Sequence, residues 1–104
     1  MMRAFLISDN LDSLIGMRLA GVDGVVVKGP NEANLAIEEA IKDHDIGILI
    51  FTEKAAEWAY EQVRLLREKG SLPLIVEIPD RHGMKREADF LTSYVREALG
   101  VNIE

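Results

Sequence analysis

Apolar and polar residues follow a pattern that repeats four times along the chain: a short apolar run, then a longer segment with helical periodicity. The apolar runs are Ala4–Ile7, Gly24–Val27, Ile46–Phe51 and Leu74–Ile78. Continuous runs of this length are typical of strands buried on both faces, as in a parallel sheet. Because parallel strands are joined by right-handed crossovers, the pattern predicts an α/β, receiver-like fold. Its open four-stranded parallel sheet would have the order 2-1-3-4, with helices on both faces.

The segments that follow the strands repeat their apolar residues about every 3.6 positions, which predicts a helix in each. The expected helices are Asn10–Ala20, one entered at Pro30–Asn31 and ending near His44, one from Thr52–Glu53 to Gly70, and a last one at about Glu87–Leu99. Asp9 or Asn10 suits the cap of the first helix, and Thr52 suits that of the third. Gly21 and Gly70 suit C-terminal stops. The crossover rule places the first and last helices on one face of the sheet.

Each helix is expected to bury one apolar stripe. The expected inward residues are Leu11, Leu14, Ile15 and Arg18 on the first helix, Ala33, Ala36, Ile37, Ala40 and Ile41 on the second, and Ala55, Ala59, Val63 and Leu66 on the third. Trp58 falls at the border of the third stripe, and Leu35 falls outside the second. The apolar residues of the last helix span nearly half of its circumference. That helix therefore either lies deeply cradled against the sheet or turns surplus apolar surface to a partner.

Length and composition limit the class of protein. A chain of 104 residues is one domain with one hydrophobic core, and the absence of cysteine excludes disulfides and thiolate sites. A formal net charge of −6 makes nucleic acid and anionic lipid poor partners. No apolar run approaches the ~20 residues of a membrane span, and residues 1–8 do not form a signal peptide. We expect a cytoplasmic protein, with any membrane association coming through partners.

In the predicted topology, a ligand would bind at the carboxyl ends of the first and third strands. The residues at these ends are Ser8, Asp9, Thr52 and Glu53. They include none of the glycines of a dinucleotide-binding turn, and the chain has no phosphate-binding loop motif. His44 and His82 do not stand at metal-ligand spacing. The sequence therefore predicts no catalytic, cofactor-binding or metal-binding residue.

A phospho-receiver domain shares the predicted topology and provides the alternative hypothesis. Such a domain needs carboxylates after the first strand to hold Mg²⁺ and an aspartate at the end of the third strand to accept the phosphoryl group. Asp9 stands in the first of these regions, but Thr52 follows the third apolar run, and no fifth strand is recognisable. A receiver-like signalling or small-ligand-binding domain is therefore the alternative function.

Four segments carry a more specific pattern. They are residues 8–22 (SDNLDSLIGMRLAGV), 46–57 (IGILIFTEKAAE), 72–80 (LPLIVEIPD) and 95–103 (VREALGVNI). In this order they resemble the F subunit of the V/A-type ATPases, whose corresponding patterns read GDxxTxxGFRLAGV, IGIILITEEIAE, LPPIVEIPD and VRKAVGVDI. The departures are small: Ser8 replaces glycine, Ser13 replaces threonine and Met17 replaces phenylalanine. The resemblance runs nearly from end to end.

The resemblance implies a non-catalytic subunit of the central stalk, the rotor of the ATPase. Such a protein binds the coiled coil of the D subunit and helps to couple ATP hydrolysis or synthesis to the transport of protons or sodium ions. The family also has a last helix, here residues 87–99, that can move and reach the A and B subunits of the catalytic head. The implied location is cytoplasmic and peripheral to the membrane.

Partner-binding residues are expected on two apolar surfaces and at one charged position. The candidates are Val25, Val26 and Val27 on the edge strand, Phe90, Tyr94 and Leu99 on the last helix, and Arg18. Arg18 pairs either with a local carboxylate or with an acidic partner. Glu77, within the fourth strand, either protects an exposed strand edge from wrong pairing or contacts a partner.

Overall fold

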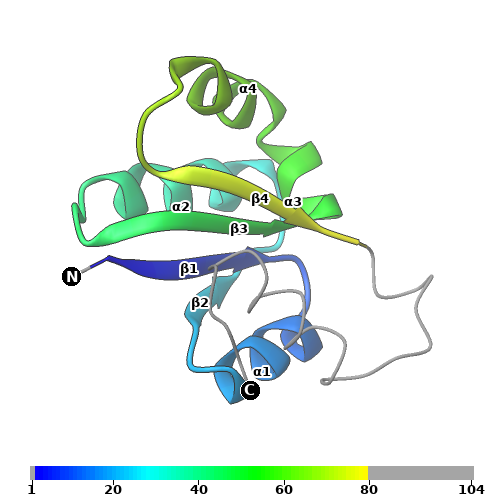
Figure 1. The fold of residues 1–104 in the computed structure, drawn as a ribbon. Helices are drawn as coiled ribbons and strands as arrows, with labels where there is room; N and C mark the ends of the chain where they lie inside the picture. The colour runs from blue at the N-terminus through cyan, green and yellow to red at the C-terminus, as the bar shows by residue number, and fades with distance from the viewer. Residues whose placement is uncertain (1, 80–104) are drawn as a thin grey trace.

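The computed structural model describes residues 2–79, which form a four-stranded sheet with helices on both faces (Figure 1). The elements are β1 (Arg3–Ser8), α1 (Leu11–Leu19), β2 (Asp23–Val26), α2 (Pro30–Ile41), β3 (Ile46–Thr52), α3 (Glu53–Trp58), α4 (Tyr60–Lys69) and β4 (Leu74–Ile78). Neighbouring strands are all parallel, in the order β2-β1-β3-β4. The predicted fold class and strand order are confirmed. The predicted helix at 87–99 lies outside the described residues.

The core consists of two layers, one on each face of the sheet. In Figure 1, α2, α3 and α4 lie above the sheet and α1 lies below it. The upper layer includes Ile7, Ile37, Leu49, Phe51, Ala55, Ala59 and Val63, and the lower layer includes Leu6, Leu14, Met17, Ile50 and Ile78. Successive residues of a strand point to opposite faces, so the central strands supply both layers. This is why β3 appears in the sequence as an unbroken apolar run.

Gly24 allows β2 to lie close against β1. The two strands pair Leu6 with Gly24. A Cβ atom at Gly24 would lie 2.5 Å from the carbonyl oxygen of Leu6 and 2.7 Å from its Cβ. These distances are shorter than van der Waals contact, so any larger side chain would push the edge strand away.

The predicted helix caps are formed as expected. Asn10 caps α1, since its side-chain oxygen accepts the backbone N–H of Ser13 at 2.7 Å. Thr52 caps α3, where its hydroxyl accepts the N–H of Ala55 at 3.4 Å. Gly21 has a φ of 87°, and Gly70, which follows α4, has a φ of 71°. Glycine takes this left-handed conformation without a steric penalty, so both positions end helical segments.

The segment predicted as one helix from Thr52 to Gly70 consists of two helices. The break is at Ala59, whose φ and ψ are −116° and 37°. Its side chain is buried as predicted, at 2% exposure. The break redirects α4 over β4, where Arg67 contacts Glu77 at 3.0 Å. The sequence has neither proline nor glycine at this point, so the helical pattern gave no sign of the break.

Helix α2 agrees with the prediction except at its end. Ala33, Ile37 and Ala40 are buried, and Leu35 is 58% exposed, as expected. The helix ends at Ile41 rather than near His44, and Ile41 is 40% exposed, so its predicted burial is wrong. Ile41 is the last helical residue, and the chain turns towards β3 directly after it, so its side chain remains partly open to solvent.

Candidate partner-binding surface

The carboxyl ends of β1 and β3 meet, and polar side chains there hold the following helices in place. The hydroxyl of Thr52 accepts the backbone N–H of Asp9 at 3.1 Å, which ties the turn after β1 to the end of β3. Ser8 is fully buried, and its hydroxyl donates to the carbonyl of Asn10 at 2.7 Å and accepts the N–H of Asn10 at 2.9 Å. The amide of Asn10 donates to the carboxylate of Asp9 at 3.0 Å. These groups satisfy one another's hydrogen-bonding capacity, so their role is structural.

The same region lacks the features of a reaction centre in the part of the chain that the structure describes. Among residues 2–79, no three acidic or histidine side chains are grouped to hold a metal ion. Every buried side-chain nitrogen and oxygen of these residues has a hydrogen-bond partner. Thr52 stands where a receiver domain carries its phosphoryl-accepting aspartate, and its hydroxyl caps α3. This geometry gives the receiver-like alternative no support.

Helix α1 turns a row of large apolar side chains outward. Leu11 is 60% exposed, Ile15 is 49% exposed and Leu19 is 71% exposed. The prediction that Leu11, Ile15 and Arg18 face the sheet is therefore wrong, whereas Leu14 is buried as predicted. The buried side of the helix consists of Ser13, Leu14, Gly16 and Met17. The helix carries two apolar rows, and the small residues Ser13 and Gly16 accompany the inner row, where they let the helix pack closely on the sheet. We call Leu11, Ile15 and Leu19 the α1 ridge.

Arg18 lies beside the α1 ridge and reaches Asp23 at the start of β2. Its guanidinium is 3.3 Å from the Asp23 carboxylate, and the two side chains are 59% and 67% exposed. The same carboxylate accepts the backbone N–H of Gly24 at 2.8 Å. The Gly24 N–H, followed by the Arg18 guanidinium, lowers the pKa of the Asp23 carboxyl. Of the two hypotheses for Arg18, the local pair is therefore observed, although a pair this exposed contributes little to stability.

The three valines predicted to bind a partner differ in exposure. Strand β2 forms one edge of the sheet, as predicted. Val25 is 37% exposed at this edge, Val26 is half-buried, and Val27 is only 3% exposed within the upper core layer. Val27 therefore belongs to the core, whereas Val25 leaves an apolar side chain at the edge. The other predicted residues, Phe90, Tyr94 and Leu99, lie outside the described residues.

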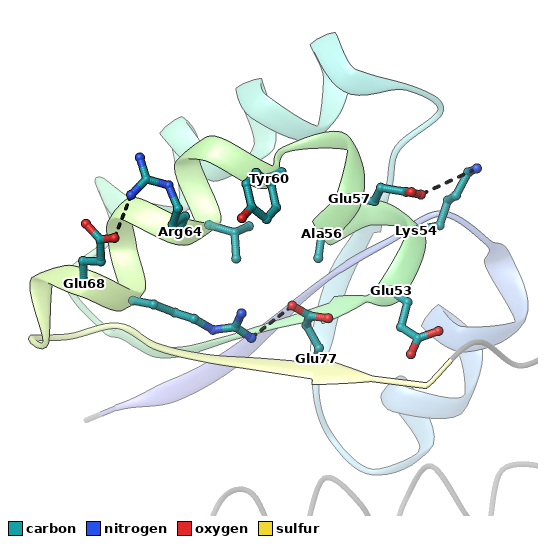
Figure 2. Close-up of a pocket in the computed structure, with 10 residues that line it drawn as sticks. Glu53, Lys54, Ala56, Glu57, Tyr60, Arg64, Glu68 and Glu77 are labelled. Atoms are coloured by element: carbon teal, nitrogen blue, oxygen red, sulfur yellow. Dashed lines mark hydrogen bonds and ion pairs between the residues drawn. The ribbon is translucent and has the colours of Figure 1, made fainter.

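An open groove lies between helices α3 and α4 and the outer strand β4 (Figure 2). Across this groove, Arg67 contacts Glu77 at 3.0 Å. Along α4, Arg64 contacts Glu61 at 2.8 Å and Glu68 at 2.6 Å, and these carboxylates raise the pKa of Arg64. The charges of the groove largely neutralise one another, as is typical of a solvated surface. Glu77 places a paired charge on the strand edge, in keeping with its predicted protective role.

The family of the chain follows from comparison with known proteins. A family model described as ATP synthase (F/14-kDa) subunit matches residues 4–95. The chain belongs to this family. The F subunit of the A-type ATP synthase of Methanococcus vannielii is 37% identical over 105 residues, which cover 99% of this chain and 100% of that protein. The corresponding F subunit of Methanocaldococcus jannaschii is 35% identical over 94 residues, covering 89% of this chain and 91% of that protein.

A solved structure supports the fold of this ATP synthase subunit. The crystal structure of the F subunit of the V-type ATP synthase from Archaeoglobus fulgidus superposes with a TM-score of 0.62 at 24% identity. The match covers 74% of this chain and 96% of that one. As the resemblance predicted, the chain is a subunit of an A/V-type ATP synthase rather than an enzyme in its own right. Within residues 2–79, none of the helices has the length and apolar character needed to cross a bilayer.

Proposed function

We propose that the chain is a central-stalk subunit that binds the coiled coil of the D subunit and helps to couple ATP hydrolysis or synthesis to ion transport. In this role it sits in the rotor, contributes no catalytic residue, and is cytoplasmic and peripheral to the membrane. A last helix at 87–99 provides a second contact, with the A and B subunits of the catalytic head. The transported ion is either a proton or a sodium ion.

The observation that carries the proposal is the α1 ridge in a chain of this family. Three large apolar side chains lie on one exposed face of a single short helix. A helix that is apolar on both faces is typically buried on both faces. An exposed apolar patch of this kind is more often an interaction site than an average part of the protein surface is. The polar groups at the carboxyl ends of β1 and β3 are, in contrast, engaged in local hydrogen bonds.

The direct test is complex formation between the full chain and its cognate D subunit. The two proteins are co-expressed, purified through a tag on the D subunit, and separated on a sizing column with in-line light scattering. We expect a 1:1 complex of the two chains. A coiled coil of similar length from an unrelated protein, carrying the same tag, controls for non-specific capture. If the D subunit elutes without the chain, or if both coiled coils retain it equally, the stalk assignment is wrong.

A further inference from the structure

The helices cover the two faces of the sheet unequally. Helices α2, α3 and α4 lie on the upper face, and α1 is the one described helix on the lower face (Figure 1). The contacts of α1 with the sheet are concentrated on β1 and β2. Within residues 2–79, the lower side of β3 and β4 is therefore largely without a helix. A parallel sheet of this kind normally has both faces covered.

The side of β3 and β4 that α1 leaves open is apolar. Ile48 of β3 pairs with Leu74 of β4, and Val76 follows two residues later on β4. Because residues two apart on a strand share a face, Leu74 lies on the same face as Val76, which packs with Ile48 against the lower core layer. Leu74 is 55% exposed, and Ile48 and Val76 are half-buried. We call these three residues the lower-face patch.

The opposite side of β4 is already occupied. Helix α4 lies over it, and Arg67 of α4 contacts Glu77 of β4 at 3.0 Å. Ile75, which shares that face with Glu77, packs against the upper core layer. A segment that follows β4 and carries an apolar face therefore finds its open apolar surface on the lower side of the same strand.

We propose that residues 87–99 pack as a helix on the lower-face patch when the chain is outside the assembly. These residues lie beyond the described part of the chain, and their sequence places Phe90, Leu91, Tyr94, Val95, Ala98 and Leu99 over nearly half of a helical circumference. A helix of this length extends over about 20 Å, and β4 extends over about 16 Å, so the two match. Residues 80–86 can reach about 23 Å, more than the roughly 10 Å between packed layers.

Charge and connectivity favour this segment over a second copy as the occupant. Each copy carries a formal net charge of −6, so self-association would bring two acidic molecules together. Residues 87–99 are instead tethered to the end of β4 by a short connection. Such a tether gives an effective concentration of roughly millimolar order, well above that of a second copy in dilute solution.

The chain has no cysteine, so pairs of introduced cysteines report proximity directly. One variant carries Leu74→Cys and Ala98→Cys, because a helix that returns along β4 brings residue 98 close to the start of the strand. The matched control carries Leu65→Cys and Ala98→Cys. Leu65 lies on α4, on the upper side of the sheet, and is 55% exposed like Leu74. A third variant adds Tyr94→Glu to the first pair, which places a charge within the apolar face of residues 87–99.

The full chain is oxidised alone in dilute solution, and the rate of disulfide formation is followed by non-reducing electrophoresis and intact mass. Circular dichroism of the reduced proteins establishes that each variant is folded. A disulfide requires Cα atoms within about 7 Å, so only a docked segment brings the first pair together often. We expect that pair to close within the chain at least about tenfold faster than the control pair, and Tyr94→Glu to remove most of the difference.

Three results would overturn the proposal. Equal rates for the first pair and the control pair would mean that residues 87–99 have no preferred seat on the lower-face patch. An unchanged rate with Tyr94→Glu would mean that their apolar face does not make the contact. A disulfide-linked dimer of the first pair in place of the intrachain product would identify a second copy as the occupant. Because the chain is tested alone, none of these results bears on binding of the D subunit.

Discussion

Thr52 connects three parts of the fold through one hydroxyl group, and Thr52→Val tests that role. The residue ends β3, caps α3 and is only 3% exposed. Its hydroxyl accepts the backbone N–H of Asp9 at 3.1 Å and that of Ala55 at 3.4 Å. Valine has nearly the same shape as threonine but cannot accept a hydrogen bond. The substitution therefore leaves two N–H groups without their acceptor while it preserves packing.

The expected loss of stability is the sum of two contributions. Losing a helix N-cap costs about 0.5–2 kcal/mol, and the long 3.4 Å contact places this cap near the lower end. Leaving a buried N–H unpaired costs about 1–3 kcal/mol, and the Asp9 amide lies in the lower part of that range because its site is only partly buried. Together these give about 2 kcal/mol. For a domain of roughly 100 residues, this corresponds to a melting temperature about 10 °C lower.

The measurement is urea unfolding of the full chain followed by far-ultraviolet circular dichroism, with a thermal melt as a second readout. Thr52→Ser is the matched control, because it keeps the hydroxyl and removes only the methyl group. We expect Thr52→Ser to lose about 1 kcal/mol or less, well below the loss for Thr52→Val. If the valine variant is as stable as the original chain, or if serine is the more damaging change, the hydroxyl does not connect these elements as argued.

Three further predictions follow from other positions. Gly24→Ala should lower the free energy of unfolding by about 1–3 kcal/mol, because the new Cβ would overlap the backbone of Leu6. The Asp23 carboxyl should titrate below its usual value of 3.8 in a carbon-13 NMR titration, and Arg18→Ala should reverse only part of that shift, because the Gly24 N–H is the larger cause. The lowered pKa means that ionised Asp23 stabilises the folded state relative to the unfolded state. Its contribution to the free energy of unfolding is present above about pH 4 and is lost as the pH falls below it. Glu77→Val should increase light scattering on concentration, because it leaves an uncharged apolar strand at the sheet edge.

Each of these predictions has its own control. Gly29→Ala should be nearly neutral, because a Cβ atom there meets nothing within 4 Å; equal losses at both glycines would contradict the close-approach argument. High salt should weaken the contribution of Arg18 to the Asp23 pKa, since both side chains are exposed. Arg67→Ala removes the ion pair but keeps the carboxylate on β4. If this variant scatters light as strongly as Glu77→Val, the ion pair rather than the edge charge prevents association.

Much of the fold was predictable because the local preferences of the sequence agree with the overall topology. The unbroken apolar runs identified parallel strands, and Thr52, Gly21 and Gly70 marked helix ends through their intrinsic chemistry. The break at Ala59 was not predictable, because its backbone turns without proline or glycine. Such a break depends on how the helices on either side pack, which a periodic pattern does not encode.

The surface was harder to predict than the core. On α1, one row contains Leu14 and Met17 and the other contains Leu11 and Ile15, and periodicity alone does not decide which row faces the sheet. We expected one inward face that combined residues of both rows: Leu11, Leu14, Ile15 and Arg18. Instead, the structure buries the row accompanied by Ser13 and Gly16, the smaller residues. Val25 and Val27, at the end of β2 and directly after it, show the same limit, since apolar residues two positions apart differ widely in exposure.

The position of β1 has a consequence for how the chain assembles. Although β1 begins at the third residue, it lies inside the sheet and is hydrogen-bonded to β2 on one side and β3 on the other. During synthesis β1 emerges before both of its neighbours, and β3 follows only after some forty residues, since Phe5 pairs with Leu49. The sheet therefore closes late, after a long loop has formed. Deleting β1 would remove the middle of the sheet and separate β2 from the rest.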